Sequence, residues 1–305
     1  MSELAKQTSH ILIDWGTSSL RLWGVNTVGD LLFKKHVPLG MSKLSPKDYE
    51  PLLEAMLSQL GVNKNIPVLI CGMAGAAQGW QEVSYIDLPT RLDGLSQFAV
   101  QVKTKGRDVR ILPGLAQRSK SLPDIMRGEE TLLLGAMLNG LPNENYCMPG
   151  THSKWVHITD GEVRKFRTFM TGEVFALFSE HSTLSHFLGD KGENLYQHPA
   201  FVSAVNEIKT KPNMLMNTLF SIRSGALLFP NQNNFYLQAR LSGLLIGAEI
   251  AVMANKSSNK IGLIAMGELA DSYSSAMRLL AMDFDIIDSH DLALSGLKFI
   301  ADKLW

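Results

Sequence analysis

The feature that most constrains the fold is a pattern that occurs twice, in IDWGTSSLRLW and in MPGTHSKWV. Each copy begins as an apolar strand, passes through Gly-Thr-x-Ser (Gly16–Ser19 and Gly150–Ser153) and returns to alternating apolar residues. A tight turn and a further strand follow each copy, at Gly29-Asp30 and at Asp160-Gly161. A repeated strand-loop-strand-turn-strand unit predicts two similar halves, each built around one copy.

Strand and helix patterns alternate through the rest of the chain, as is typical of an α/β fold. The predicted elements of the first half are a helix at Pro46–Leu60, strands at Val68–Cys71 and Val109–Leu112, and a helix at Glu129–Leu138. The second half predicts helices at Gly172–Leu188, Pro199–Lys209, Asn217–Leu228 and Phe235–Ala254, then a strand at Ile261–Met266, a helix at Ala270–Met282, a strand at Phe284–Asp288 and a helix at Asp291–Leu304. We therefore expect an α/β protein with domains at 1–140 and 141–305 and with extra helices in the C-terminal half.

Composition excludes several classes of function. Lys+Arg and Asp+Glu both total 29, so nothing favours binding to nucleic acid or to an anionic membrane. Cys71 and Cys147 stand in apolar, strand-like segments, which is typical of free thiols in a reducing compartment. The N-terminus has no apolar signal core, and no run of about 18 apolar residues stands out, so we expect a cytoplasmic protein.

Both Gly-Thr-x-Ser loops have the composition of a phosphate-binding hairpin, because glycine lets backbone N–H groups approach an anion and hydroxyls add rotatable donors. The candidate ligands are Gly16, Thr17, Ser18 and Ser19 in the first loop, and Gly150, Thr151, His152, Ser153 and Lys154 in the second. Asp14 is a hard carboxylate that can hold Mg²⁺ directly or through water. In the second loop, the position that corresponds to Asp14 is Met148, and the positive charge of Lys154 is nearby in the sequence instead. Each loop alone is also explained by an ordinary hairpin turn.

A catalytic base has candidates in the segment MRGEET, where Glu129 and Glu130 open a predicted helix. A carboxylate there could accept a proton from a hydroxyl as the terminal phosphoryl group leaves ATP. Acids in the first turn of a helix are also favoured by the helix dipole, by about 0.3–1 kcal/mol, so spacing alone does not assign them a catalytic role.

Six stretches carry a resemblance to a known family: IDWGTSSLRLW, GMAGAAQGW, MRGEET, MPGTHSKWV, FRTFMTGE and LSGLLIGAE. In this order they resemble sugar kinases of the actin/hexokinase/Hsp70-type ATPase superfamily and, within it, the 2-dehydro-3-deoxygalactonokinase family. The resemblance implies two ribonuclease-H-like domains with ATP and Mg²⁺ in a cleft between them. It also implies that the two Gly-Thr-x-Ser loops hold the ATP phosphates.

The same resemblance suggests roles for further residues. Glu129 matches the position of the catalytic aspartate of carbohydrate kinases, with Glu130 and Asp124 as alternatives. Where relatives have paired glycines for adenosine, this chain has Gly267 followed by Glu268. The implied substrate is an anionic keto-deoxy acid, and its candidate contacts are Arg21, Arg127, Arg167, Gln78 and Trp80. Each arginine is equally explained as a solvated or paired surface charge, and Trp80 as a core residue.

The activity implied is ATP-dependent phosphorylation of 2-dehydro-3-deoxy-D-galactonate at its terminal hydroxyl, giving the 6-phosphate in galactonate degradation. Three alternatives stay open: another keto-deoxy sugar acid as acceptor, a non-catalytic ATP-binding switch of the same fold, and a phosphatase that needs no acceptor. The oligomeric state is open between a monomer and a homodimer.

Overall fold

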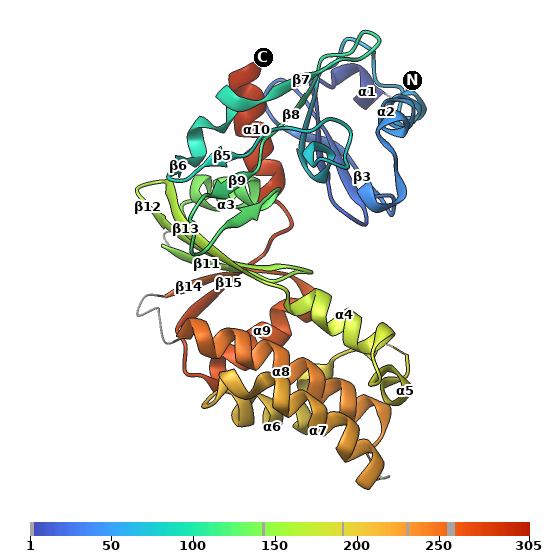
Figure 1. The fold of residues 1–305 in the computed structure, drawn as a ribbon. Helices are drawn as coiled ribbons and strands as arrows, with labels where there is room; N and C mark the ends of the chain where they lie inside the picture. Colours follow the sequence, from blue (N-terminus) through green and yellow to red (C-terminus); the bar gives the residue numbers. More distant parts are fainter. Residues whose placement is uncertain (1–2, 142–143, 191, 230–231, 255–259) are drawn as a thin grey trace. The chain divides into compact units, whose positions relative to one another are not determined.

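The computed structural model describes residues 3–141, 144–190, 192–229, 232–254 and 260–305 (Figure 1). The chain forms two compact units. Unit 1 comprises the described residues within Met1–Pro142, Thr159–Lys165 and His290–Trp305, and unit 2 those within Asn143–Ile158 and Phe166–Ser289. Compared with the division expected at residue 140, unit 1 also takes in a hairpin tip and the C-terminal helix.

Unit 1 is built on a six-stranded sheet of order β3-β2-β1-β4-β8-β7. Its strands are β1 His10–Trp15, β2 Leu20–Val25, β3 Leu31–Val37, β4 Val68–Gly72, β7 Val100–Val102 and β8 Val109–Ile111. Its helices are α1 Glu3–Gln7, α2 Tyr49–Gln59, α3 Glu129–Leu138 and α10 Leu292–Leu304. A second sheet, β10-β9-β5, joins Asp124–Met126, Leu115–Gln117 and Ile86–Asp87. Strands β1, β4 and β8 run parallel, whereas β1, β2 and β3 form antiparallel hairpins.

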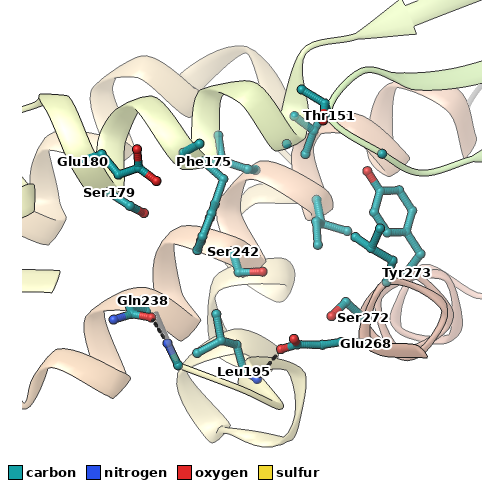
Figure 2. A pocket seen from close by; sticks show the side chains of 18 of the residues that line it. Thr151, Phe175, Ser179, Glu180, Leu195, Gln238, Ser242, Glu268, Ser272 and Tyr273 are labelled. Atoms are coloured by element: carbon teal, nitrogen blue, oxygen red, sulfur yellow. Dashed lines mark hydrogen bonds between the residues drawn. The ribbon is translucent and has the colours of Figure 1, made fainter. Parts of the chain in front are cut away.

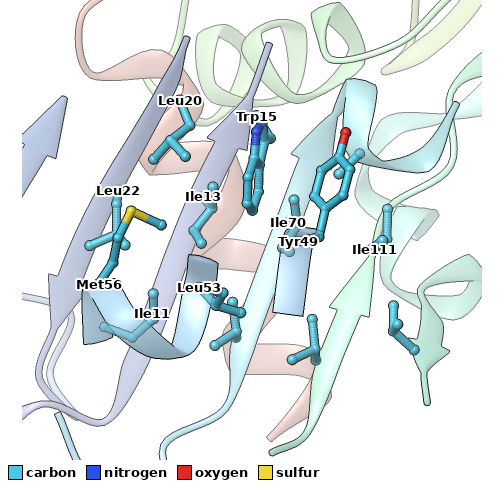
Figure 3. Close-up of a cluster of buried hydrophobic side chains, with 14 of the residues drawn as sticks. Ile11, Ile13, Trp15, Leu20, Leu22, Tyr49, Leu53, Met56, Ile70 and Ile111 are labelled. Atoms are coloured by element: carbon cyan, nitrogen blue, oxygen red, sulfur yellow. The ribbon is translucent and has the colours of Figure 1, made fainter. Parts of the chain in front are cut away.

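The main core of unit 1 lies between this sheet and α2 (Figure 3). Alternate residues of β1, such as Ile11 and Ile13, meet Leu53 and Met56 of α2 in one buried cluster. Trp15 ends the row, with its ring centroid 4.7 Å from that of Tyr49. The alternation of side chains along a strand and their 3.6-residue period on a helix bring these residues to one interface.

Helices α3 and α10 pack closely because glycines stand at their contact. A Cβ atom at Gly135 would lie 2.0 Å from the Leu292 carbonyl oxygen, and one at Gly296 would lie 2.3 Å from the Thr131 carbonyl oxygen. Residues far apart in the sequence thus fix the position of α3, the helix that begins with Glu129 and Glu130.

Unit 2 repeats the strand order of unit 1. Its strands are β11 Asn145–Met148, β12 Ser153–Thr159, β13 Glu162–Phe169, β14 Ile261–Ile264 and β15 Phe284–Ile287, in the order β15-β14-β11-β12-β13. Strand β11 pairs antiparallel with β12 and parallel with β14, as β1 does with β2 and β4. The predicted internal repeat is therefore confirmed, and each copy forms the first three strands of a ribonuclease-H-like sheet. The tip of the β12–β13 hairpin belongs to unit 1, where Glu162 and Val163 pair with β6 (Thr90–Arg91).

The predicted extra helices lie in unit 2: α4 Thr171–His181, α5 Ser185–Leu188, α6 Pro199–Ile208, α7 Leu215–Leu228, α8 Asn234–Ala254 and α9 Gly267–Leu279. In the GLLIGAE stretch, a Cβ at Gly243 would lie 2.5 Å from the Phe201 carbonyl oxygen of α6, so these small residues serve packing inside the chain. Helix α8 is long and apolar enough to cross a membrane by length and composition alone, but 78% of the relevant window is buried inside the structure. It is best explained as a core helix.

Two local expectations differ from the structure, and one region of short strands was not predicted. The helix expected at Gly172–Leu188 is divided into α4 and α5, since Ser182 is extended (φ −111°, ψ 174°) and its hydroxyl bonds the Phe178 carbonyl. The helix expected at Pro46–Leu60 begins with a 3₁₀ turn, in which Ser45 and Asp48 form a capping box. The short strands between Ile86 and Met126 had no clear sequence signal, because two or three residues are too few to show a period.

We predict that Gly135→Ala destabilises the protein by at least about 2 kcal/mol, because the added methyl group must displace the α10 backbone. Urea unfolding would measure the loss. Gly94→Ala is the matched control, since its Cβ would meet nothing within 4 Å. Equal stability of the two variants would contradict the close contact of α3 with α10.

Candidate active site

The first Gly-Thr-x-Ser loop is braced from one side by residues 40–42. The Met41 amide donates to the Gly16 carbonyl, and the amide and hydroxyl of Ser42 both donate to the Thr17 carbonyl, at 2.9–3.0 Å. A Cβ at Gly40 would lie 2.3 Å from the same Thr17 carbonyl, so only glycine fits there. Thr17 and Ser18 are exposed, Ser19 is half-buried, and neither the Thr17 nor the Ser18 amide donates to another described residue. The loop thus presents donors outward.

Asp14 and Arg21 form an ion pair, which their sequence separation did not reveal. They lie opposite each other in the β1–β2 register, and both Nε and Nη2 of Arg21 donate to Asp14 Oδ2, at 3.2 and 2.5 Å. The other oxygen, Oδ1, accepts no hydrogen bond from a described residue and would lie 3.2 Å from a Cβ at Gly72. Arg21 is therefore engaged by the candidate metal ligand.

The candidate bases lie near Asp14 within unit 1. Gly72, at the end of β4, touches both regions, because a Cβ at Gly128 would be 3.4 Å from its Cα atom. Glu129 is half-buried at the first position of α3, and its Oε2 accepts from the Arg127 amide at 2.9 Å. The carboxyl ends of β1 and β4 and the start of α3 thus meet at one edge of the sheet, the usual ligand edge of an α/β unit.

Glu130 and Asp124 differ from Glu129 in their surroundings. Glu130 is fully buried, its Oε2 accepts from the Gly128 amide at 2.7 Å, and burial together with the Glu129 charge raises its pKa to about 8. Asp124 is half-buried in β10 and accepts from the Ile125 amide at 2.8 Å. Of the three, Glu129 combines a place at the strand ends with access to solvent.

The second Gly-Thr-x-Ser loop is held differently from the first. Gly150 and Thr151 border a cavity, whereas Ser153 is fully buried and donates to Glu249 at 2.6 Å. His152 is exposed and lies 2.6 Å from Glu173 Oε2. Lys154 is buried and stands opposite Met148 in the β11–β12 register, the place that corresponds to Arg21 opposite Asp14.

The cavity, of about 520 Å³, lies wholly within unit 2 (Figure 2). Its walls come from the second loop and from helices α4, α8 and α9, with Phe175, Leu195, Leu245 and Ile246 as apolar lining. Thr151 and Tyr273 stand at one end, whereas Ser179, Glu180 and Gln238 stand toward the other. This size and mixture of apolar walls with a few polar groups suit a nucleoside-sized ligand.

The expected adenosine contacts are partly at this cavity. Glu268, in the first turn of α9, lines it and accepts from the Leu195 amide at 3.4 Å. Gly267 has φ +56°, and a Cβ there would meet nothing within 4 Å, so the backbone is open on that side. The sequence did not indicate Phe175, Gln238 or Ser242, because they come from helices whose inward faces read as ordinary core.

The expected sugar-acid contacts differ in burial and in their partners. Gln78 is exposed, and Trp80 packs on the core with its ring stacked on Tyr49 at 5.8 Å. Arg127 is 9% exposed; its Nη2 donates to the Val83 carbonyl, and its guanidinium lies 4.3 Å from the Tyr85 ring centroid. Its Nε and Nη1 have no hydrogen-bond partner among the described residues. Arg167 is half-buried on β13, in unit 2.

Among the residues that the structure describes, no group of three or more His, Cys, Asp or Glu could hold a metal. Mg²⁺, however, is commonly bound by one or two carboxylates together with substrate phosphates and waters. Asp14 Oδ1, which accepts no hydrogen bond from the described residues, fits that mode as the single protein ligand.

Comparisons with known proteins also indicate a kinase. Residues 14–300 match the family model described as 2-keto-3-deoxy-galactonokinase. The chain is 38% identical to the Rhizobium meliloti (strain 1021) protein named "Probable 2-dehydro-3-deoxygalactonokinase DgoK1", over 96% of both chains. It is 31% identical to the 2-dehydro-3-deoxygalactonokinase of Escherichia coli (strain K12), over 96% of this chain and 97% of that one.

A solved structure from Sinorhizobium meliloti, of a protein provisionally named a 2-dehydro-3-deoxygalactonokinase, is also similar. It superposes with a TM-score of 0.92 at 38% identity, over 97% of each chain. The fold and the order of elements described above are thus those of an experimentally determined relative.

We predict that Glu130 lowers the free energy of unfolding of the protein progressively as pH rises from about 5 to about 8. The pKa of this carboxyl is about 8 in the folded state against 4.5 in its ordinary state, so the folded protein keeps a proton that the unfolded chain releases. Glu130→Gln should therefore lose less stability over this interval than the native protein. Thermal unfolding at each pH unit would measure both, and parallel curves would contradict the buried, proton-retaining carboxyl.

Proposed function

The chain belongs to the 2-keto-3-deoxy-galactonokinase family, and we propose that it transfers the terminal phosphoryl group of ATP to 2-dehydro-3-deoxy-D-galactonate, at the terminal hydroxyl. The observation that carries this proposal is the 520 Å³ cavity that ends at Gly150 and Thr151 of the second Gly-Thr-x-Ser loop. A nucleoside-sized space that opens onto a loop of amide and hydroxyl donors is what ATP requires.

In this proposal unit 2 binds the nucleoside. The adenine lies among the apolar walls near Phe175 and Leu245, and Glu268 and Ser272 are in reach of the ribose hydroxyls. The phosphates leave the cavity past Tyr273 and Thr151, where the loop amides and the N-terminus of α4 favour negative charge.

Unit 1 supplies the groups that act on phosphate charge. The outward donors of Thr17 and Ser18 bind phosphate oxygens, and Asp14 would hold Mg²⁺. When bound there, Mg²⁺ would supply positive charge against the phosphates. Arg21, which donates twice to Oδ2, fixes the orientation of the Asp14 carboxylate.

Glu129 is the proposed base. It accepts the proton of the acceptor hydroxyl while the oxygen of that hydroxyl forms a bond to the γ-phosphorus and the bond from phosphorus to the bridging oxygen of ADP breaks. Its hydrogen bond from the Arg127 amide orients the carboxylate. Glu130, fully buried beside it, is less suited because no part of its side chain reaches solvent.

Arg127 is the proposed partner of the substrate carboxylate. Two of its nitrogen groups lack a partner among the described residues, and unpaired buried donors cost about 1–3 kcal/mol each. A bidentate carboxylate would satisfy such a guanidinium, once the surrounding side chains move to admit it. Of the other candidates, Arg21 already pairs with Asp14.

Coupled measurement of ADP formation tests the activity. With Mg²⁺ and ATP, we expect turnover with the galactonate-derived acid, and Glu129→Gln should lower kcat by at least ~10²-fold because the proton acceptor is lost. Glu50→Gln is the matched control, since Glu50 also stands in the first turn of a helix and lies outside the proposed site.

The alternatives predict different results. Faster turnover with another keto-deoxy acid would change the acceptor, and turnover that survives Glu129→Gln would move the base to Glu130 or Asp124. Phosphate release without an acceptor would indicate a phosphatase. Nucleotide binding with no acid-dependent turnover would favour an ATP-binding switch.

We further predict that Arg127→Lys raises KM for the sugar acid at least ~10-fold and leaves KM for ATP within about 2-fold, because lysine keeps the charge and loses the planar pair of donors. Steady-state kinetics with each substrate varied would show this. Arg167→Lys is the comparison variant; an increase in KM for the acid in that variant alone would transfer the role to Arg167.

A further inference from the structure

One buried carboxylate in unit 2 has no role in the site described so far. Glu249, on α8, is 3% exposed and accepts four side-chain hydrogen bonds. Ser153 Oγ and Trp155 Nε1 donate to its Oε1 at 2.6 and 2.7 Å. Tyr273 Oη donates to its Oε2 at 2.8 Å, and Thr171 Oγ1 donates to the same oxygen.

The four donors belong to elements that surround the second Gly-Thr-x-Ser loop. Ser153 is the first residue of β12 and Thr171 is the first residue of α4. Thr171 and Tyr273 also line the cavity. One side chain of α8 therefore ties together the exit of the loop, the start of α4 and the inner face of α9.

The loop itself depends on where α4 begins. The Glu173 amide donates to the Thr151 carbonyl at 2.9 Å. Gly172 lies directly against the loop, because a Cβ there would come within 2.4 Å of the Gly150 carbonyl oxygen. A shift of the first turn of α4 would consequently move Gly150 and Thr151.

The carboxylate is well matched to this arrangement. Its two oxygens offer about four acceptor sites, and the four donors occupy them. Loss of the acceptors would leave buried hydroxyl and indole donors unpaired, which costs free energy and allows the elements to separate.

We propose that Glu249 is a positioning residue, which fixes the Gly150–Thr151 loop and the first turn of α4 at the end of the cavity and thereby sets the affinity for the nucleotide phosphates. This inference rests on the proposed function, because it takes the cavity as the nucleotide site. Glu249 acts through Ser153 and Thr171 and does not itself line the cavity.

The test compares nucleotides that differ in their phosphates. Calorimetry would give dissociation constants for adenosine, for ADP and for a non-hydrolysable ATP analogue with Mg²⁺. We expect Glu249→Gln and Thr171→Val to weaken ADP and the analogue at least ~10-fold and adenosine less than about 3-fold. Thr171→Ser, which keeps the hydroxyl, should recover most of the affinity for ADP and the analogue that Thr171→Val loses.

Two controls separate positioning from a general loss of stability. Glu54→Gln disrupts the ion pair with buried Arg107 in unit 1, at 2.7 Å, and should lower the unfolding temperature while nucleotide binding stays unchanged. A double-mutant cycle of Glu249→Gln with Thr171→Val should show non-additive losses in ADP affinity, because one hydrogen bond is removed from either side.

The outcomes are distinguishable. A native protein that binds none of the three ligands would overturn the proposed function. A native protein that binds them, with Glu249→Gln and Thr171→Val unchanged in ADP affinity or weakened equally for adenosine, would overturn the positioning role alone. If Glu249→Gln does not fold, the pair Thr171→Val and Thr171→Ser decides the question.

Discussion

The parallel pairing of an early strand with a much later one is the constraint on which the rest of each unit depends. Strand β1 pairs in parallel with β4, and β11 pairs in parallel with β14. On its other side, each of these strands pairs antiparallel with the strand that follows it in the sequence. Parallel neighbours need a long connection, so helices must cover the sheet. The same pairing places the Gly-Thr-x-Ser loop at the carboxyl end of the central strand, beside the ends of the strands that follow.

The two copies of the repeat use this place differently. In unit 1, Arg21 on β2 is paired with Asp14, and the loop is held by its carbonyl groups, so Thr17 and Ser18 are left exposed. In unit 2, Ser153 of the loop is buried, and the loop is held by the hydrogen bond that Ser153 donates to Glu249. Similar sequences thus give one loop that presents side-chain donors and one whose backbone borders a cavity.

Much of this fold is predictable from the sequence, because long elements carry a clear period. The bounds of α3, Glu129–Leu138, are those that the apolar pattern predicts, and the repeat predicts the three-strand unit that both halves share. The division of α4 from α5 was not predictable, since the apolar spacing continues through Ser182 while the backbone does not.

The site was predictable only in part. Segments near the strand ends were indicated by their loops, but two side-chain pairings were not. Arg21 meets Asp14 across a strand register, and Ser153 meets Glu249 of helix α8, at separations of 7 and 96 residues. The cavity walls were missed because inward helix faces of unit 2 have the same composition whether they meet a ligand or another helix. Sequence patterns indicate which faces of helices and strands are buried. They do not indicate which of these faces leave a cavity between them.

Unit 1 is discontinuous in the chain, and this affects how the protein is made. Helix α10, which packs against α3, is synthesised only after the whole of unit 2. Domains generally fold as units during synthesis, in the order in which their residues emerge. Here unit 1 is incomplete until α10 has been made, and until then the face of α3 that packs against α10 is uncovered. Folding of unit 1 therefore depends on a segment that follows unit 2 in the sequence.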